Sequence, residues 1–346
     1  MGEPHPDRRA RIAVVLIDTD EGELLEETLP LLEAQTRPPD EIVVVDNAAS
    51  DGSPEWIRER HPRVRIVALS QRAGFAEANN RGVRAAGDCD LVALLNADAF
   101  PEPQWLERLE AAARDHPDAA AFSSLMLDGR DPTLLDGTGD VMHRNGLAGR
   151  RHHGHPIAET PEASVPADVF AACAGAALYR REVFEALGGF DESYFIYFED
   201  ADLSFRMQLL GHGVRYVPGS VVRHLGSATT GVDSDFTIYH TQRNLVWMFW
   251  KAMPWPLLVL YLPAHLAMHA GMTWDYVRAG RAGPVLRAKR DALRGLPRVL
   301  RERRAIRRRR RVSSRELRSR MEPIDSWFSP SWFRKRREAA RMIRGS

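Results

Sequence analysis

The stretch Asp90-Leu-Val-Ala-Leu-Leu-Asn-Ala-Asp98 leads from consecutive apolar residues into a polar ending, and earlier parts of the chain repeat this arrangement. A short continuous apolar run of this kind predicts a strand buried on both faces. Similar runs precede it, at residues 11–17, 41–46 and 64–69. Segments with helical apolar spacing separate them, at residues 24–35, 54–60 and 75–86. Strands that alternate with helices predict an α/β fold, with a mostly parallel sheet covered by helices on both faces.

Polar residues follow three of these strands, in the segments Asp18-Thr-Asp20, Asp46-Asn47 and Asn96-Ala-Asp98. In open α/β sheets, ligands bind at the edge where the strands end. A single Asp in such a position is usually a turn or cap residue. Three acidic endings on one edge would repel one another unless a cation lay among them. The pattern therefore predicts a ligand site with a cation at this edge.

A second informative stretch is Tyr194-Phe-Ile-Tyr-Phe-Glu-Asp-Ala-Asp-Leu-Ser-Phe-Arg206. Four aromatic residues precede the acids Glu199, Asp200 and Asp202, and the apolar spacing that follows predicts a helix whose first turn holds all three acids. Acids in this position can interact with the helix macrodipole and have no other role. A carboxylate beside aromatic surface can also stay basic enough to accept a proton. These residues alone leave both interpretations open.

The charge of the chain is divided between a body and a tail. Residues 278–346 hold 24 Lys and Arg against 6 Asp and Glu, a net charge of +18, and the first 277 residues carry −17. An acidic body with a strongly basic tail indicates an anionic surface as a partner. Nucleic acid is not expected as that partner, because the acidic body would repel phosphate and no nucleic-acid-binding motif accompanies the tail.

Composition also bears on location and on domain organisation. Cys89 and Cys173 are the only cysteines and lie far apart, which predicts a reducing compartment and no disulfide framework. The polar N-terminal residues lead directly into a strand and are not expected to be a signal peptide. We expect a domain at residues 1–250, with a long loop or flap at 128–166, and a helical C-terminal region at 251–346.

Six short motifs occur in order across roughly the first 250 residues. They are Val44-Val-Asp-Asn-Ala-Ala-Ser-Asp-Gly52, Gly74-Phe-Ala-Glu-Ala-Asn-Asn-Arg-Gly82, Leu94-Leu-Asn-Ala-Asp98, Gly188-Gly-Phe-Asp191, Phe198-Glu-Asp-Ala-Asp-Leu203 and His224-Leu-Gly-Ser227. With these motifs the chain resembles inverting glycosyltransferases of family 2, in the branch that includes bacterial rhamnosyltransferases. The resemblance implies the GT-A fold, a Rossmann-like sheet flanked by helices, and residues 1–250 as its catalytic domain.

The resemblance also implies a donor site and a metal site. Asp46 would accept the ring N–H of the nucleotide base, and Asp98 and His224 would bind Mn²⁺ or Mg²⁺. The remaining donor-binding residues implied are Gly74, Asn79, Asn80 and Asn96, and Asp18 is expected at the same site because it ends the first strand. The family's Asp-x-Asp motif reads Asn96-Ala-Asp98 here, which removes one charge and is a trait of this branch.

For catalysis, the resemblance implies Asp200 as the base and Glu199 with Tyr197 in the acceptor site. Asp202 is expected to be structural, as a cap or as a partner of Arg206. The acceptor hydroxyl must lose its proton as it attacks, which requires a carboxylate within hydrogen-bond reach. A single displacement of this kind inverts the anomeric centre.

The implied partners are a nucleoside-diphosphate sugar, with dTDP-rhamnose favoured, and a lipid-linked or polysaccharide acceptor in cell-envelope glycan synthesis. Galactofuranose or mannose are alternative sugars, because Arg72 and Asp18-Thr-Asp20 depart from the family pattern. A non-catalytic nucleotide-sugar or glycan-binding scaffold is a rival function, although the implied base and metal ligands are all present. A nucleotidyltransferase would need a basic, Gly-rich loop after the first strand, and Asp18-Thr-Asp-Glu21 has the opposite charge.

The C-terminal region suggests contact with a membrane. The apolar segment 255–269 is interrupted by Pro and His and is too short to span a bilayer, which needs about 20 apolar residues. Four tryptophans suit the bilayer interface: Trp247, Trp250, Trp255 and Trp274. Anionic lipid is favoured by the basic residues that follow, namely Arg287, Lys289, Arg290, Arg294 and the block Arg301–Arg311. We expect a peripheral protein on the cytoplasmic face of the bacterial inner membrane. The alternative is a packed helical hairpin with a solvated basic tail.

Overall fold

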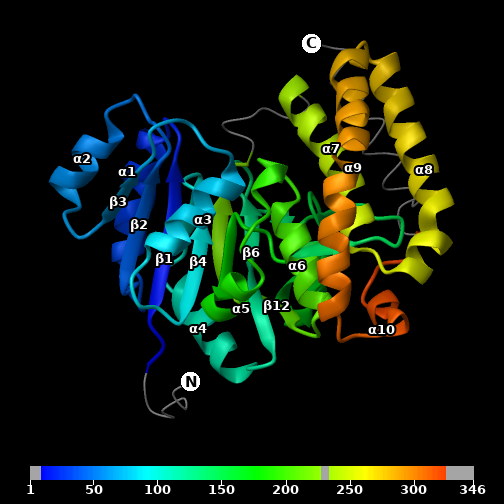
Figure 1. Ribbon diagram of the computed structural model, residues 1–346. Coiled ribbons are helices and arrows are strands. Elements are labelled where there is room, and N and C mark those ends of the chain that lie inside the picture. Colours follow the sequence, from blue (N-terminus) through cyan, green and yellow to red (C-terminus); the bar gives the residue numbers. More distant parts are fainter. Residues whose placement is uncertain (1–8, 227–233, 325–346) are drawn as a thin grey trace.

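The computed structural model describes residues 9–226 and 234–324, and Figure 1 shows a sheet with a layer of long helices beside it. Ser227, which ends the last sequence motif, and residues 325–346 of the basic tail lie outside the described residues. The strands are β1 (Ile12–Asp18), β2 (Glu41–Asp46), β3 (Arg65–Ala68), β4 (Leu91–Leu95), β5 (Ala99–Pro101), β6 (Ala119–Asp128), β7 (Leu135–Gly137), β8 (Asp140–Met142), β9 (Ala148–Arg150), β10 (Ala167–Asp168), β11 (Ala176–Arg180) and β12 (Gly213–His224).

The helices cover both faces of the sheet and form the neighbouring layer. They are α1 (Gly22–Glu33), α2 (Ser53–Arg60), α3 (Phe75–Ala85), α4 (Trp105–Asp115), α5 (Arg181–Ala186), α6 (Glu199–Leu209), α7 (Asp235–Ala252), α8 (Trp255–Arg278), α9 (Ala282–Arg309) and α10 (Ser314–Ser319). Three short 3₁₀ helices lie between them, at η1 (Ile157–Glu159), η2 (Pro161–Ser164) and η3 (Glu192–Tyr194).

The main sheet has the strand order β10-β12-β6-β11-β4-β1-β2-β3. Strands β3, β2, β1 and β4 are parallel, as the sequence predicted. Strand β11 is antiparallel to both β4 and β6, and β5 and β10 are antiparallel to β12. The sheet is therefore mixed: β6 and β12 run in the same direction as β4, and the prediction of a mostly parallel sheet is wrong for β11 and for the short strands β5, β7 and β10. No crossover helix joins β6 to β11, and without one the returning strand pairs in the antiparallel direction.

The apolar pattern of residues 214–218 and 220–224 predicts a bent pair of strands, and instead both segments belong to the single strand β12. This strand pairs with β6 in parallel along its length, with a shift of register between Val217 and Val221. Pro218 and Gly219 lie in the shift, where the absent N–H of proline and the absent side chain of glycine are tolerated. The predicted bend is present, but it lies inside one strand and does not divide it into two.

Strand β1 shows why the apolar runs are continuous. Its alternate side chains enter two separate hydrophobic cores, one on each face of the sheet, with Ala13, Val15 and Ile17 on one side and Ile12, Val14 and Leu16 on the other. Helix α3 packs very closely on the first of these faces, because a Cβ added to Gly82 would lie 2.3 Å from Cγ1 of Val15. A glycine at this position sets the distance between helix and sheet.

Residues 128–166, expected to be a long loop or flap, contain short strands of their own. Strand β7 pairs with β6, and β8 pairs with β9 in a separate two-stranded sheet. These strands place Asp136 and Asp140 among buried residues. The segment is therefore partly built into the body of the protein.

Helices α6 to α10 share a third hydrophobic core beside the sheet. Helix α7 packs along α9, and α8 packs against α9. Buried Lys251 of α7 lies 3.0 Å from Asp202 of α6, 2.7 Å from Asp191 and 3.6 Å from Glu302 of α9. A buried ionic network thus connects the C-terminal helices to the body that carries the sheet. Within the described ranges, none of the helices combines the length and the hydropathy that a bilayer-spanning segment requires.

Candidate active site

The ends of the parallel strands bring two of the predicted donor residues together. Strands β1 and β2 end side by side, with Asp18 opposite Asp46. Buried Asp18 accepts hydrogen bonds from the Ser53 hydroxyl at 2.5 Å and from the Glu21 N–H at 3.1 Å. Burial raises the pKa of Asp18, and these hydrogen bonds only partly offset the effect. Half-buried Asp46 accepts a hydrogen bond from the Ala49 N–H at 3.0 Å.

The three acidic strand endings do not form the single cation-binding cluster that their repulsion suggested. Each ending has partners of its own instead. In the first, Asp18 bonds Ser53 and Asp20 pairs with Arg72; in the second, Asp46 accepts a hydrogen bond from the Ala49 N–H; in the third, Asp98 contacts His224. The charge of Asp46 still raises the pKa of Asp18, so the first two endings do repel each other, and of these acids Asp98 is the one that faces a histidine.

His224, at the end of β12, joins two carboxylates. Its Nε2 lies 3.2 Å from Oδ1 of Asp98, and its Nδ1 lies 2.8 Å from Oδ2 of Asp136. The amide nitrogen of Asn96 is 3.3 Å from the same Nε2. Burial disfavours the charged imidazole, but the hydrogen bonds to Asp136 and Asp98 outweigh burial and raise the pKa of His224.

This arrangement fits a divalent cation. The proton that the raised pKa favours on Nε2 lies between this nitrogen and a carboxylate oxygen of Asp98, 3.2 Å apart. In a neutral ring whose Nδ1 donates to Asp136, the lone pair of Nε2 faces that oxygen, and a cation could take the place of the proton. A carboxylate that orients a histidine in this way is the usual support of a metal ligand. Oxygen and imidazole ligands suit Mn²⁺, and oxygen ligands suit Mg²⁺. Asp98 and His224 could therefore hold the predicted metal, with Asp136 fixing the ring.

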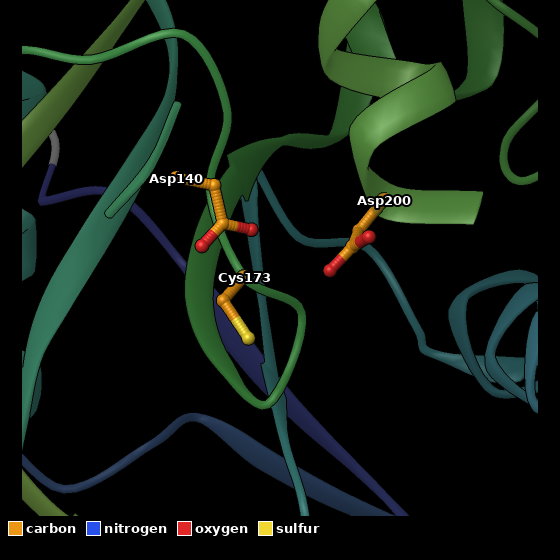
Figure 2. A group of neighbouring side chains, drawn as sticks. All are labelled: Asp140, Cys173 and Asp200. Carbon is orange, nitrogen blue, oxygen red and sulfur yellow. The ribbon is translucent and has the colours of Figure 1, made fainter. Parts of the chain in front are cut away.

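A second cluster contains the predicted base. One ligand atom from each of Asp140, Cys173 and Asp200 lies within 4.8 Å of the others, and Figure 2 shows the two carboxylates reaching toward a common space near the thiol. These three ligand atoms lie close enough together to hold a metal ion. Burial raises the pKa of the Cys173 thiol, so this ligand is protonated at neutral pH. Soft metals that prefer thiolate would bind it better than Mg²⁺.

Asp200 is held by backbone groups at the start of α6. Its Oδ2 accepts a hydrogen bond from the Ala174 N–H at 3.0 Å, and its Oδ1 accepts one from the Ala201 N–H at 2.7 Å. Burial raises the pKa of Asp200. Burial and the charge of Asp200 raise the pKa of Asp140 to about 7. Two neighbouring carboxylates of this kind share a proton, because both cannot easily ionise at once.

Arg150 of β9 connects the two clusters. It forms an ion pair with Asp136, which in turn bonds His224. Its positive charge also acts on Asp140 and Asp200, where it opposes the effect of burial. The positive charge of Arg150 therefore offsets negative charge in both clusters of the site.

The other two acids of the α6 first turn differ sharply. Asp202 bonds Arg206 at 2.8 Å and the Tyr194 hydroxyl at 3.1 Å, which confirms the prediction that it pairs with Arg206. Glu199 is also buried, but its Oε2 has no hydrogen-bond partner. Burial and the neighbouring charge of Asp200 raise the pKa of Glu199 well above its usual value. An unpartnered buried oxygen beside the predicted base is a group that a ligand could satisfy.

The aromatic loop before α6 has a strained backbone. Phe195, Tyr197 and Phe198 have φ angles of 67°, 69° and 69°, a region that residues with side chains seldom adopt. The side-chain amide of Asn244, on α7, donates hydrogen bonds to the carbonyls of residues 194, 196 and 197 at 3.0, 2.8 and 2.9 Å. The strained loop is thus fixed by one side chain from the neighbouring helix.

The side chains of this loop extend in different directions. The Tyr197 hydroxyl contacts the Thr237 hydroxyl at 3.2 Å. Phe195 is 38% exposed and stacks on His240, with ring centroids 5.2 Å apart, and Phe236 is 42% exposed in the same group. An exposed aromatic residue, Phe195, therefore lies four residues before Glu199, the predicted acceptor-site acid.

The remaining donor-site predictions concern α3. A Cβ on Gly74 would lie 2.5 Å from the Phe195 carbonyl oxygen, so this glycine allows the donor-side loop to meet the acceptor-side loop. Asn79 donates to the Phe75 carbonyl. Asn80 exchanges two hydrogen bonds with the backbone of Phe190, at 2.8 and 2.9 Å. Both asparagine side chains are buried and bond backbone groups, so they support the conformation of the chain around them.

Three residues of the site were missed from the sequence: Asp136, Asp140 and Arg150. All three come from the segment that was expected to be a loop or flap. The available signal was the pair of acids in Asp136-Gly-Thr-Gly-Asp140, which frames a tight turn. Nothing local shows that this turn faces His224, because the contact spans 88 residues.

A family model described as glycosyl transferase family 2 matches residues 14–188. The N-acetylglucosaminyl-diphospho-decaprenol L-rhamnosyltransferase of Mycobacterium tuberculosis is 30% identical over 298 residues, which cover 75% of this chain and 94% of that protein. The O-antigen biosynthesis protein RfbC of Myxococcus xanthus is 27% identical over 240 residues, which cover 65% of this chain and 18% of that protein.

Two solved structures share the fold. GalNAc-T7, solved with UDP, GalNAc and Mn²⁺, has a TM-score of 0.56 at 19% identity, over 70% of this chain and 48% of that one. The mannosyltransferase PcManGT from Pyrobaculum calidifontis, in complex with GDP-Man and Mn²⁺, has a TM-score of 0.50 at 21% identity, over 92% of this chain and 86% of that one. These likenesses show a GT-A-like α/β fold. Because the family model spans half of the chain and the mycobacterial relative is matched over nearly its whole length, the protein is a glycosyltransferase that belongs to glycosyl transferase family 2.

Proposed function

We propose that this glycosyltransferase moves rhamnose from dTDP-rhamnose to a lipid-linked glycan acceptor in cell-envelope glycan synthesis, in one inverting displacement. The observation that carries this proposal is the match to the mycobacterial rhamnosyltransferase, whose name specifies a polyprenyl-diphosphate acceptor and which is aligned over 94% of its length. The two clusters of the site support it, because one suits a donor diphosphate with its cation and the other suits proton transfer.

On the donor side, Asp46 would accept the base N–H, and Asp18, Gly74 and Asn96 would line the nucleotide. Asp98 and His224 would hold Mn²⁺ or Mg²⁺, which supplies positive charge to the departing diphosphate. Asp136 keeps the imidazole of His224 oriented, through its contact at 2.8 Å. Asn79 and Asn80 act indirectly, because their hydrogen bonds hold the backbone on which this side rests.

On the acceptor side, Asp200 would accept the proton of the attacking hydroxyl. Burial keeps this carboxylate more basic than an exposed aspartate, and two backbone N–H groups fix its direction. Glu199 would bind the acceptor through its unpartnered Oε2, and the hydroxyl of Tyr197 and the ring of Phe195 would form the adjoining wall. The attacking oxygen then forms the new glycosidic bond as the diphosphate leaves from the opposite face.

We place the protein at the cytoplasmic face of the bacterial inner membrane. A lipid-linked acceptor is confined to a bilayer, and nucleotide sugars are made in the cytoplasm. Residues 1–250 would supply the catalytic domain and residues 251–346 the contact with the membrane.

Transfer and donor binding should separate in two variants. Asp200→Asn should abolish release of dTDP from dTDP-rhamnose in the presence of a polyprenyl-diphosphate N-acetylglucosamine acceptor, while calorimetric donor binding changes less than about threefold, because the base acts after binding. Asp98→Ala should instead weaken donor binding by about tenfold or more in Mn²⁺ and have little effect in chelator.

The same assay with UDP-galactofuranose and GDP-mannose tests the sugar. Turnover with either donor above that with dTDP-rhamnose would refute the rhamnose assignment. Retained turnover in Asp200→Asn would refute the base. Asp202→Asn is not a suitable control, since Asp202 holds the buried ionic network, and exposed Asp168→Asn should behave as the native protein.

A further inference from the structure

Exposed apolar side chains are concentrated on the two C-terminal helices. Among the described residues, twelve large hydrophobic side chains are well exposed, and nine of them lie on α8 or α9. On α8 they are Trp255, Val259, Leu260, Leu266, Trp274 and Val277, and on α9 they are Leu286, Leu293 and Leu300, with exposures from 39% to 64%. Scattered exposed leucines are ordinary, but a concentration on one pair of helices indicates an interaction surface.

Helix α8 has two apolar faces, of which only one is covered. Leu257, Leu258 and Tyr261 are buried in the third core, and Trp255, Leu266 and others project outward. From residue 255 to residue 274 the sequence contains no Asp, Glu, Lys or Arg. A helix of 24 residues is about 36 Å long, and Figure 1 shows α8 at the outer side of the helical layer. The outward face of α8 is therefore a long, uncharged apolar strip.

Helix α9 carries a different pattern beside it. The dipeptides Leu286-Arg287, Leu293-Arg294 and Leu300-Arg301 recur every seven residues, so that they lie along one side of the helix, and all six side chains are exposed. One acidic residue of α9 reaches this row: Asp291 pairs with Arg294 as well as with Arg290, whereas Glu302 pairs with Arg298, outside the row. Arg287 and Arg301 keep the row positive, and leucines beside such arginines suit a surface that is apolar below and anionic above.

We propose that the outward face of α8 and the Leu-Arg row of α9 form a membrane-binding surface that lies in the interface of an anionic phospholipid bilayer. Apolar side chains of such helices enter the boundary between head groups and acyl chains, and arginines bind the head-group phosphates. Trp255 and Trp274 near the two ends of the strip occupy the positions that indole prefers at this boundary. A second copy of the chain is a poorer partner, because two rows of arginines would then face each other.

This inference rests on the proposed function for its purpose, since a lipid-linked acceptor must be reached from the bilayer. It also assigns part of the binding to α8, which lies almost entirely before the basic tail, and the rest to the Leu-Arg row of α9 within that tail. Helix α7 lies between this surface and the site: it packs along α9, and its Asn244 holds the strained loop before α6. Helix α7 therefore supports both the membrane-binding surface and the strained loop before α6.

The test is co-sedimentation of the full-length protein with vesicles of phosphatidylcholine alone and with added phosphatidylglycerol. Val259→Gln/Leu266→Gln/Trp274→Gln should weaken binding to both vesicles by about tenfold or more, because insertion depends on apolar area. Arg287→Gln/Arg294→Gln/Arg301→Gln should remove only the gain that phosphatidylglycerol gives. These side chains are exposed, so the thermal midpoints of both variants should equal that of the native protein.

Two controls match these changes. Leu266→Gln and Val165→Gln replace side chains that are both 57% exposed, and only the first should weaken binding. Arg58→Gln/Arg63→Gln/Arg114→Gln removes the same charge from the sheet body and should leave binding unchanged.

The proposal is overturned if the native protein does not sediment with either vesicle, or if the α8 variant binds like the native protein. It is also overturned if light scattering shows a dimer that the α8 variant dissociates, which would assign the face to a second copy. Vesicle binding without any sugar transfer would refute the proposed function and leave this surface standing.

Discussion

Asp140 is a buried carboxylate next to the predicted base, and one of its oxygens has no hydrogen-bond partner. Relative to the native protein at the same pH, Asp140→Asn should raise the free energy of unfolding more at pH 8 than at pH 5. The folded pKa is about 7 against a reference value of 3.8, so between these values the folded state keeps a proton that the unfolded chain has lost. Stability therefore falls as the pH rises through this window, by at most about 4 kcal/mol.

Urea unfolding of both proteins at pH 5 and pH 8 measures this difference. Asp168→Asn, at a carboxylate that is 79% exposed, should show no such dependence. An equal effect of Asp140→Asn at the two pH values would show that Asp140 is not held protonated by its surroundings.

Single residues could be predicted from the sequence where the reason is local. The pairing of Asp202 with Arg206 follows from a spacing of four residues on a helix, and it is confirmed. The roles of Asp98, His224 and Asp200 stay predictions, although the structure places each in a buried acidic cluster. Asp136 and Arg150 could not be predicted, because their contacts depend on how a distant segment folds back on the sheet.

At the scale of elements, the approach of α3 to the sheet gives a sharp test. Gly82→Ala should destabilise the protein by about 1–3 kcal/mol, because the added methyl group overlaps Val15 and Val45. Gly271→Ala on α8 meets no atom within 4 Å and should be neutral or stabilising by up to about 1 kcal/mol, through helix propensity alone. Denaturant midpoints compare the two, and equal effects would mean that the helix–sheet contact is looser than described.

Hydrophobic periodicity predicted the positions of the strands and helices well, but it did not predict the direction of each strand in the sheet. The first four strands and their helices follow the apolar runs closely. The reversed direction of β11 leaves no mark in its own residues, because Ala176–Arg180 is buried on both faces in either direction. Strand direction is decided by the connection, and here the connection is the segment that holds Asp136 and Asp140.

At the scale of the whole molecule, the buried network around Lys251 should make the chain unfold as one unit. Lys251→Met should destabilise the fold by about 3–5 kcal/mol, because it leaves Asp191 and Asp202 buried without this cation. Arg290→Met removes a solvent-screened pair whose arginine is 54% exposed, and it should leave the thermal midpoint nearly unchanged. Calorimetry should show one transition in the native protein. Two separated transitions would mean that the C-terminal helices fold independently.

The charge division of the sequence indicated an anionic partner, but it did not locate the surface. The tail was expected to act through its basic residues from Arg287 to Arg311, and the structure adds the uncharged outer face of α8 as a separate feature. Composition averages over a helix, whereas binding depends on which side chains remain uncovered after packing. Which side chains stay uncovered is decided by the packing of α7 and α9, and composition does not describe that packing.

The outer face of α8 has a kinetic consequence. A protein that lies on a bilayer meets a lipid-linked acceptor by diffusing in two dimensions, so that its encounters depend on molecules per unit area and not on molecules per litre. Diluting the acceptor with inert phospholipid should then slow turnover even when the total acceptor concentration is constant, a behaviour known as surface dilution. The enzyme would register how crowded the membrane is with its acceptor, rather than how much acceptor the sample contains.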